Sequence, residues 1–352
     1  MKMKKTVVRG SVLFVAILSF ALIYGSGTSQ AAEKVFRMKI QSAYPRGDYS
    51  MELLNEFAAA ADKNSKGRIK IQVFAAPEIV PVENLFEATQ KGTLTMLHAV
   101  AAMWGGIVPI GEVEFGLPYA YNLPGEPDVY ESGKQIRDFF MKTGFADLLR
   151  QEYAKQGLYW LDVHSYGPLF TMSTKKVTTC EDLQGMKFRV EGSWSDYYNL
   201  LGARGTYISG EETYMGLKLG TIDASQWDVS ATTGLKWHEV APYRILGGQN
   251  DVVVGHILMN LDTWNELSDD LKKALSDAAE QYFHDLNKFY EGELKKNEEL
   301  VKAGKVINSP IDAACDKKHE EAAYQIWDKI AERDAAAAQG IEIIKAWRKT
   351  LK

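Results

Sequence analysis

The feature that most constrains this fold is one long amphipathic helix expected near the end of the chain. Ser268 is a suitable N-cap, and apolar residues then recur at helical spacing on one face. The residues on this face are Leu271, Leu275, Ala278 and Tyr282. Continued to Ala303, the helix would be about 54 Å long at ~1.5 Å per residue. A helix of this length can run along two domains as a spine.

Ahead of this helix, strand-like and helix-like segments alternate. The first part of the chain reads as a β-α-β-α-β series, with segments at 35–43, 47–67, 69–73, 82–91 and 94–100. This order favours a parallel α/β sheet with crossover helices. A second α/β unit is expected to begin at Leu158. Residues 107–132 show no clear helix, and one helix is expected over 134–155.

The length of 352 residues and a composition of 46% hydrophobic residues suit two core-forming domains. We expect lobe 1 at 33–157, with 247–267 returning to it, and lobe 2 at 158–246. Residues 268–352 would form the spine helix and C-terminal helices that pack on both lobes. A chain that leaves one lobe, builds a second and returns creates a cleft between them, where small ligands bind.

The N-terminal segment, residues 1–32, has the pattern of a signal peptide. Basic residues precede a short apolar run over 12–24, and Ala31 and Ala32 offer small residues for cleavage after either one. A retained anchor is the alternative, but the run is short for a membrane span. We therefore expect an exported, periplasmic protein.

Charge and motifs exclude several functions. Removing the four cations of the signal segment takes the formal net charge from −5 to −9, which does not suit nucleic-acid binding. No nucleophile elbow, phosphate loop or zinc-protease motif is found, and the six histidines are scattered. We therefore expect no enzyme activity, no cofactor and no metal. Cys180 and Cys315 could form one long-range disulfide or remain free thiols.

The segment from Asp182 to Gly192 is the strongest candidate for a binding function. It reads as a helical end, a turn at Gly185 and a strand that carries Arg189 near its end. A guanidinium presents a fork of donors that suits an oxyanion. The alternative is a surface strand arginine beside a carboxylate.

This segment resembles a known family. Residues 180–192 resemble the "DLKGLKxRVxG" segment of the extracytoplasmic solute receptors of TRAP (tripartite, ATP-independent, periplasmic) transporters, the DctP-type family. Residues 201–224 resemble that family's "LGA … ExYxALQxGxIDA" pattern, and residues 260–267 resemble its "N..xWxxL" segment. Residues 42–45, 67–71, 92 and 98–109 are similar to the branch that binds 2-oxo acids. The resemblance covers roughly residues 35–300.

The resemblance implies an α/β, two-lobed fold of the type II periplasmic-binding-protein class with a spine helix and ligand-driven closure. It implies that Arg189 grips the carboxylate of a ligand and that the protein is a receptor without enzymatic activity. The partners implied are a small organic anion and the membrane permease subunits of the transporter. We expect a monomer, with a dimer as the alternative.

Three positions depart from the 2-oxo-acid branch. Gln226 stands where the branch has a cation-coordinating glutamate, His256 where a second acid is expected, and Pro168 where the wider family has a polar anchor. These changes argue against a bridging cation, since a carbonyl oxygen brings no charge. Asp228, one residue after Trp227, is the alternative acid.

We therefore expect Arg189 to be the main ligand contact and the only full charge that faces the ligand. Gln226 and His256 are candidate hydrogen-bond partners. Other candidate ligand-binding residues, each with a plain core role as the alternative, are Tyr44, His98, Met103, Tyr166, Trp194 and Trp227. Arg46 and Arg204 are expected to be solvated.

The function expected from these observations is capture of a small carboxylate, such as a 2-oxo or 2-hydroxy acid, for a TRAP permease. A receptor for a small sulfonate is one alternative, because a guanidinium holds either oxyanion. A sensory receptor that presents its ligand to a membrane signalling protein is another.

Overall fold

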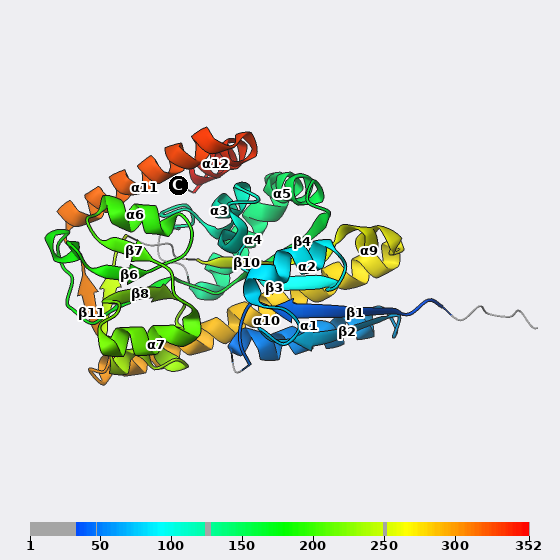
Figure 1. The fold of residues 1–352 in the computed structure, drawn as a ribbon, viewed down its shortest axis with the longest axis horizontal. Helices are drawn as coiled ribbons and strands as arrows, with labels where there is room; N and C mark the ends of the chain where they lie inside the picture. Colours follow the sequence, from blue (N-terminus) through cyan, green and yellow to red (C-terminus); the bar gives the residue numbers. More distant parts are fainter. Residues whose placement is uncertain (1–32, 47, 124–127, 249–251, 352) are drawn as a thin grey trace, which may run out of the picture. The chain divides into compact units, whose positions relative to one another are not determined.

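Two β-sheets with flanking helices form the framework of the chain (Figure 1). The computed structural model describes residues 33–46, 48–123, 128–248 and 252–351. Both sheets lie within one compact unit, Val35–Lys352. The expected signal peptide at 1–32 lies outside the described residues. The mixed α/β class expected from the sequence is confirmed.

The first sheet has the strand order β2-β1-β3-β10-β4. Its strands are β1 Phe36–Ser42, β2 Ile69–Phe74, β3 Met96–Ala99, β4 Leu158–Ser165 and β10 Val254–Asn260. Strand β1 pairs in parallel with β2 and with β3, and β10 runs antiparallel between β3 and β4. The crossover helices are α1 Tyr49–Asn64 and α2 Leu85–Gln90. The β-α-β-α-β series expected from the sequence is confirmed.

Helix α1 shows why the local sequence folds as it does. The side chain of Asp48 accepts a hydrogen bond from the backbone N–H of Ser50 and so caps the first turn. Leu54 and Phe57 are buried on the face that packs against β2 and α10. Burying each such side chain contributes about 1.5–3 kcal/mol. The same hydrogen bond also holds the carboxylate of Asp48 in place in the connection between β1 and α1.

Strand β4 corrects one expected boundary. It was expected to open the second lobe, but it pairs with β10 over its whole length, from Leu158 opposite Asn260 to Ser165 opposite Val254. It is buried because α10 packs on it together with α4 Val129–Lys142 and α5 Phe145–Ala154. Strand β4 therefore belongs to the first sheet.

Two helix expectations also differ from the structure. The single helix expected over 134–155 is divided into α4 and α5 at Gly144, whose φ of 83° lies in the left-handed region. Helix α3 Ile110–Phe115 lies in the stretch expected to hold no helix.

The second sheet has the strand order β11-β9-β5-β8-β6-β7. Its strands are β5 Phe170–Ser173, β6 Lys187–Arg189, β7 Arg204–Thr206, β8 Ala224–Trp227, β9 Tyr243–Leu246 and β11 Ile307–Pro310. Its helices are α6 Trp194–Leu200, α7 Gly210–Leu219 and α8 Ser230–Thr233. Strand β6 lies between β7 and β8 and is parallel to both. The expected strand that carries Arg189 is therefore paired on both sides, next to the edge strand β7.

The long helix α10, Asp269–Lys302, has 34 residues, as the sequence predicts. It packs against α1, α4 and β4 beside the first sheet (Figure 1). It also packs against α8 beside the second sheet. The short helix α9 Leu261–Glu266 precedes it. Among the helices of the described residues, none combines the length and the apolar character needed to cross a membrane.

Two C-terminal helices complete the chain. Helix α11 Ala313–Arg333 contacts α6, and α12 Ala335–Arg348 contacts α3 and α5. A disulfide joins Cys180 to Cys315 and so links the segment before β6 to α11. Of the two alternatives that the sequence left open for these cysteines, the structure shows the disulfide.

Candidate ligand-binding site

A cleft lies where strand ends of the two sheets come together. Tyr44 and Tyr166 follow β1 and β4 of the first sheet, and Val100 follows β3. Arg189 and Gln226 lie at the ends of β6 and β8 of the second sheet. In open α/β sheets, ligands bind outside the carboxyl ends of the strands. The topology thus makes this cleft the candidate site.

The cleft consists of adjoining cavities. An inner cavity of about 60 Å³ shares Tyr44, Asp48, Arg189, Glu191 and Trp227 with an outer cavity of about 440 Å³. A third cavity of about 360 Å³ shares Glu191 with both. The two larger volumes lie in the range of about 300–1,000 Å³ typical of small-molecule sites.

Arg189 is buried at the centre of the cleft, with 3% of its surface exposed. Its Nε donates to the carbonyl oxygen of Ile208 at 3.0 Å, and its Nη2 donates to Glu191 Oε1 at 2.6 Å. Its guanidinium also lies 4.9 Å from the ring centre of Trp227 and 5.4 Å from that of Tyr207. The strand and these rings hold the guanidinium in one place.

The turn after Arg189 brings another part of the chain close. Gly192 has a φ of 54°, and a Cβ there would lie 2.5 Å from Glu112 Oε2. Glu112 Oε2 also accepts a hydrogen bond from the backbone N–H of Ser193 at 3.0 Å. Gly192 therefore permits a close contact between the segment after β6 and α3.

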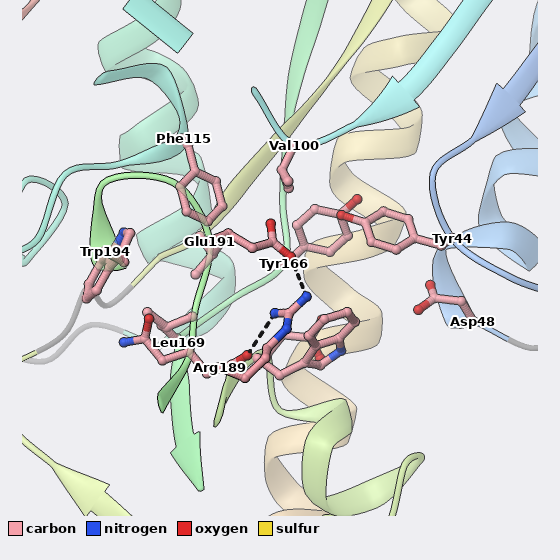
Figure 2. A pocket seen from close by; sticks show the side chains of 13 residues that line it. Tyr44, Asp48, Val100, Phe115, Tyr166, Leu169, Arg189, Glu191 and Trp194 are labelled. Atoms are coloured by element: carbon pink, nitrogen blue, oxygen red, sulfur yellow. Dashed lines mark hydrogen bonds and ion pairs between the residues drawn. The ribbon is translucent and has the colours of Figure 1, made fainter. Parts of the chain in front are cut away.

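The inner cavity also holds three carboxylates, which corrects the expectation that Arg189 is the only full charge there. They belong to Asp48, Glu191 and Asp228. Burial raises the pKa of Asp228 from its ordinary value of 3.8 to about 7, and the charge of Asp48 adds to this shift. Burial also raises the pKa of Asp48, against the hydrogen bonds from Ser50. Figure 2 shows Arg189, Glu191, Tyr44, Tyr166 and Asp48 facing one space.

Most residues expected in the site do line the cleft. Those that line the inner cavity are Tyr44, Tyr166, Arg189, Trp194, Gln226 and Trp227. Met103 lines the outer cavity and the third cavity. Arg46 lies at the outer cavity with an exposed side chain that pairs with Glu78, and Arg204 is exposed on β7. Contact of these residues with a ligand remains a prediction.

The structure places His98 and His256 behind the wall of the cleft. Both are fully buried in the first sheet, and neither lines a described cavity of the cleft. His256 Nδ1 lies 2.8 Å from Glu114 Oε1. His98 Nε2 lies 2.8 Å from the hydroxyl of Tyr282 and 3.4 Å from that of Tyr166. Burial lowers the pKa of His98 to about 3, so it is neutral.

Asp48 and Glu191 were not among the residues expected in the site, and Asp228 was expected only as an alternative. Each of these acids directly follows a strand or a strand-end turn of the two sheets. Acids at such positions are usually helix caps or solvated residues, and Asp48 is in fact a cap as well. The sequence signal that could have found them is their position after strands of a parallel sheet.

One group outside the cleft has the geometry of a metal site. Among the described residues, Cys180, Cys315 and His319 bring potential ligand atoms within 4.8 Å of one another. The two sulfur atoms are joined in the disulfide, so neither is a thiolate that could bind a metal.

The comparisons with known proteins agree with this geometry. The family model described as "Bacterial extracellular solute-binding protein, family 7" matches residues 41–334. The ectoine/5-hydroxyectoine-binding periplasmic protein UehA of Ruegeria pomeroyi is 26% identical over 271 residues, which cover 76% of this chain and 75% of that protein. A monocarboxylate 2-oxoacid-binding periplasmic protein of Nostoc sp. is 24% identical over 328 residues, which cover 92% of this chain and 86% of that protein.

A solved structure shows the same fold. A TRAP periplasmic solute-binding protein from Colwellia psychrerythraea, with bound calcium and pyruvate, superposes with a TM-score of 0.83 at 20% identity. The superposition covers 90% of this chain and 95% of that one. The two-lobed fold expected from the resemblance is thereby confirmed.

Proposed function

Because this chain belongs to bacterial extracellular solute-binding protein family 7, a family of receptors and not of enzymes, we propose that its cleft captures a small organic anion. The ligand is then delivered to the membrane permease of a TRAP transporter. The finer assignment is a carboxylate, such as that of a 2-oxo or 2-hydroxy acid, with a small sulfonate as the second candidate.

The observation that carries this proposal is the position of Arg189. It is a buried guanidinium at a strand end, inside a cleft lined from both sheets. Its fork of N–H groups matches two oxygens of a carboxylate or sulfonate. Closure of the lobes over the ligand excludes water and strengthens this charge-assisted pair by lowering the local dielectric.

Export supports the same role. Relatives of the chain carry the description periplasmic, and residues 1–32 have the sequence of a signal peptide cleaved after Ala31 or Ala32. We place the mature receptor in the periplasm as a monomer.

A thermal-shift panel tests the proposal. Pyruvate, lactate, propionate and ethanesulfonate are each added with and without Ca²⁺ or Na⁺. A ligand at 100 times its Kd stabilises the folded state by about 2.7 kcal/mol. We expect at least one anion to raise the Tm without added cation, and Arg189→Ala to abolish the shift. The proposal fails if no anion raises the Tm, or if the Arg189→Ala variant responds like the wild type.

A further inference from the structure

The charges that line the inner cavity do not balance. One guanidinium, that of Arg189, faces the carboxylates of Asp48, Glu191 and Asp228. Glu191 forms the ion pair with Arg189. Within the described part of the chain, Asp48 and Asp228 make no ion pair. Two carboxylates therefore face the cavity without a cation to balance them.

Each of these two carboxylates uses one oxygen to accept a backbone hydrogen bond, and its other oxygen has lone pairs left for a ligand. Asp48 Oδ1 accepts from the backbone N–H of Ser50 at 2.9 Å. Asp228 Oδ1 accepts from the backbone N–H of Ser230 at 2.7 Å, and its Oδ2 is reached by the hydroxyl of Tyr290 at 3.3 Å. Asp48 Oδ2 accepts no hydrogen bond from the described residues. These Oδ2 atoms can accept hydrogen bonds from a ligand.

Gln226 adds a third acceptor to the same cavity. Its side chain is 5% exposed and lines the inner cavity, and its amide nitrogen donates to the hydroxyl of Tyr198 at 3.1 Å. Its amide oxygen has no hydrogen-bond partner among the described residues. This oxygen can therefore accept a hydrogen bond from a ligand that donates one.

The aromatic lining favours an organic cation over a metal ion. Tyr44 and Tyr166 lie edge to face with ring centres 5.7 Å apart, and Trp227 lines the same cavity. Aromatic faces attract ammonium groups. A calcium ion takes about 6–8 oxygen ligands, whereas Asp48 and Asp228 each already use one oxygen for a backbone cap.

We propose that the ligand is a small zwitterion, an ω-amino acid, aminosulfonate or betaine. Its carboxylate or sulfonate binds Arg189, and its ammonium group binds between Asp48 and Asp228 beside the aromatic rings. This assignment rests on the proposed function, because it gives Arg189 the same role.

The coupling between the two acids supports this placement. The charge of Asp48 raises the pKa of Asp228 in addition to the larger effect of burial. An ammonium between the two carboxylates would offset that repulsion, as an opposite charge does for any buried acid.

Calorimetric titration of matched ligand pairs at pH 8 tests the inference. β-Alanine differs from propionate, and taurine from ethanesulfonate, by the ammonium group alone, and glycine betaine supplies a quaternary ammonium. We expect the ammonium-bearing member of at least one pair to bind at least tenfold more tightly than its partner.

The variants Asp48→Asn and Asp228→Asn test whether these two residues cause the preference for the ammonium-bearing ligand. Asparagine keeps the capping acceptor but removes the charge. We expect each variant to reduce the ratio of zwitterion to anion affinity at least tenfold. Asp334→Asn is the matched control, because Asp334 caps α12 by accepting from Ala337 outside the cleft. That variant is expected to keep the wild-type ratio.

Three results would overturn the inference: equal affinity within both pairs, an unchanged ratio in both cleft variants, or no binding of any of the three zwitterions. If simple anions bind through Arg189 without any preference for the ammonium, this inference fails while the proposed function stands. If Arg189→Ala binds both kinds of ligand like the wild type, the proposed function itself fails.

Discussion

Arg189 and Glu191 form an ion pair in the centre of the cleft, with Nη2 2.6 Å from Oε1. One residue separates them, so in extended chain their side chains leave the backbone on the same side. Both side chains are largely buried. Glu191 therefore occupies part of the guanidinium fork that an oxyanion would use, and it would compete with such a ligand for Arg189.

The substitution Glu191→Gln should increase the affinity for a simple anion such as propionate or ethanesulfonate. It removes the competing charge beside the guanidinium, an effect of about 1–2 kcal/mol or roughly 5–30-fold in Kd. Calorimetric titration measures this. Glu211→Gln is the control, because Glu211 lines the outer cavity and does not pair with Arg189. A weaker affinity in Glu191→Gln would show instead that Glu191 contacts the ligand favourably.

His256 should contribute to stability and not to affinity. It lies in the core beside Glu114, whose carboxylate also accepts from Trp160 Nε1 at 2.6 Å and from the hydroxyl of Tyr153 at 2.7 Å. We expect His256→Ala to lower the free energy of unfolding by about 2–4 kcal/mol, through lost packing and the loss of one hydrogen bond to the buried carboxylate of Glu114. Denaturant unfolding measures the loss.

The partly exposed His284 offers a matched control for that experiment. His284→Ala should change the free energy of unfolding by less than about 1 kcal/mol. The structural role of His256 is contradicted if His256→Ala lowers ligand affinity tenfold while its stability matches that of the control.

The disulfide between Cys180 and Cys315 should stabilise the fold across a sequence separation of 135 residues. Its removal in a Cys180→Ser, Cys315→Ser double variant should cost about 2–5 kcal/mol, because the unfolded chain regains the freedom of a long loop. Unfolding curves with and without dithiothreitol measure this. The reductant should destabilise the wild type and leave the double variant unchanged. Identical midpoints for all four curves would contradict the role of the disulfide.

Asp228 should make the unliganded protein less stable as the pH rises. Its pKa is about 7 in the folded state against an ordinary value of 3.8, so between these values the folded state holds a proton that the unfolded state has released. The free energy of unfolding then falls by up to about 1.4 kcal/mol per pH unit from roughly pH 4 to pH 7. The substitution Asp228→Asn should remove this fall in the free energy of unfolding with rising pH.

The Tm difference between Asp228→Asn and the wild type should therefore grow from pH 5 to pH 8. Melting curves at four pH values across this range measure it, with Asp334→Asn as the control at a helix cap outside the cleft. Parallel pH profiles for Asp228→Asn and the wild type would show that the carboxyl of Asp228 titrates near its ordinary value.

The elements with strong local patterns could be predicted from the sequence. The spacing of Leu271, Leu275 and Ala278 predicted α10, and alternating patterns predicted β1 and β2. Strand β4 was grouped with the second sheet instead of the first because its partner β10 lies about 90 residues later, and local pattern carries no information about such pairing. The break at Gly144 was missed because both flanking segments have helical patterns.

The candidate site was predicted in part for similar reasons. Arg189 follows a motif with a glycine turn and a strand end, and the structure places it in the cleft. His256 lies in a strand that is buried throughout, so the sequence pattern could not tell whether its side chain faces the cleft or the core. The acids of the cleft were missed because the cavity is assembled from strand ends far apart in sequence.

The most direct test of the central claim is the affinity of Arg189→Lys for the anion that gives the largest thermal shift, measured by calorimetry. Lysine keeps the charge but lacks the planar fork of donors. We expect a loss of about 2–5 kcal/mol, at least 30-fold in Kd. The matched variant Arg204→Lys, on the exposed strand β7, should bind within threefold of the wild type. Binding by Arg189→Lys within threefold of the wild type would contradict the assignment of Arg189 as the residue that grips the ligand.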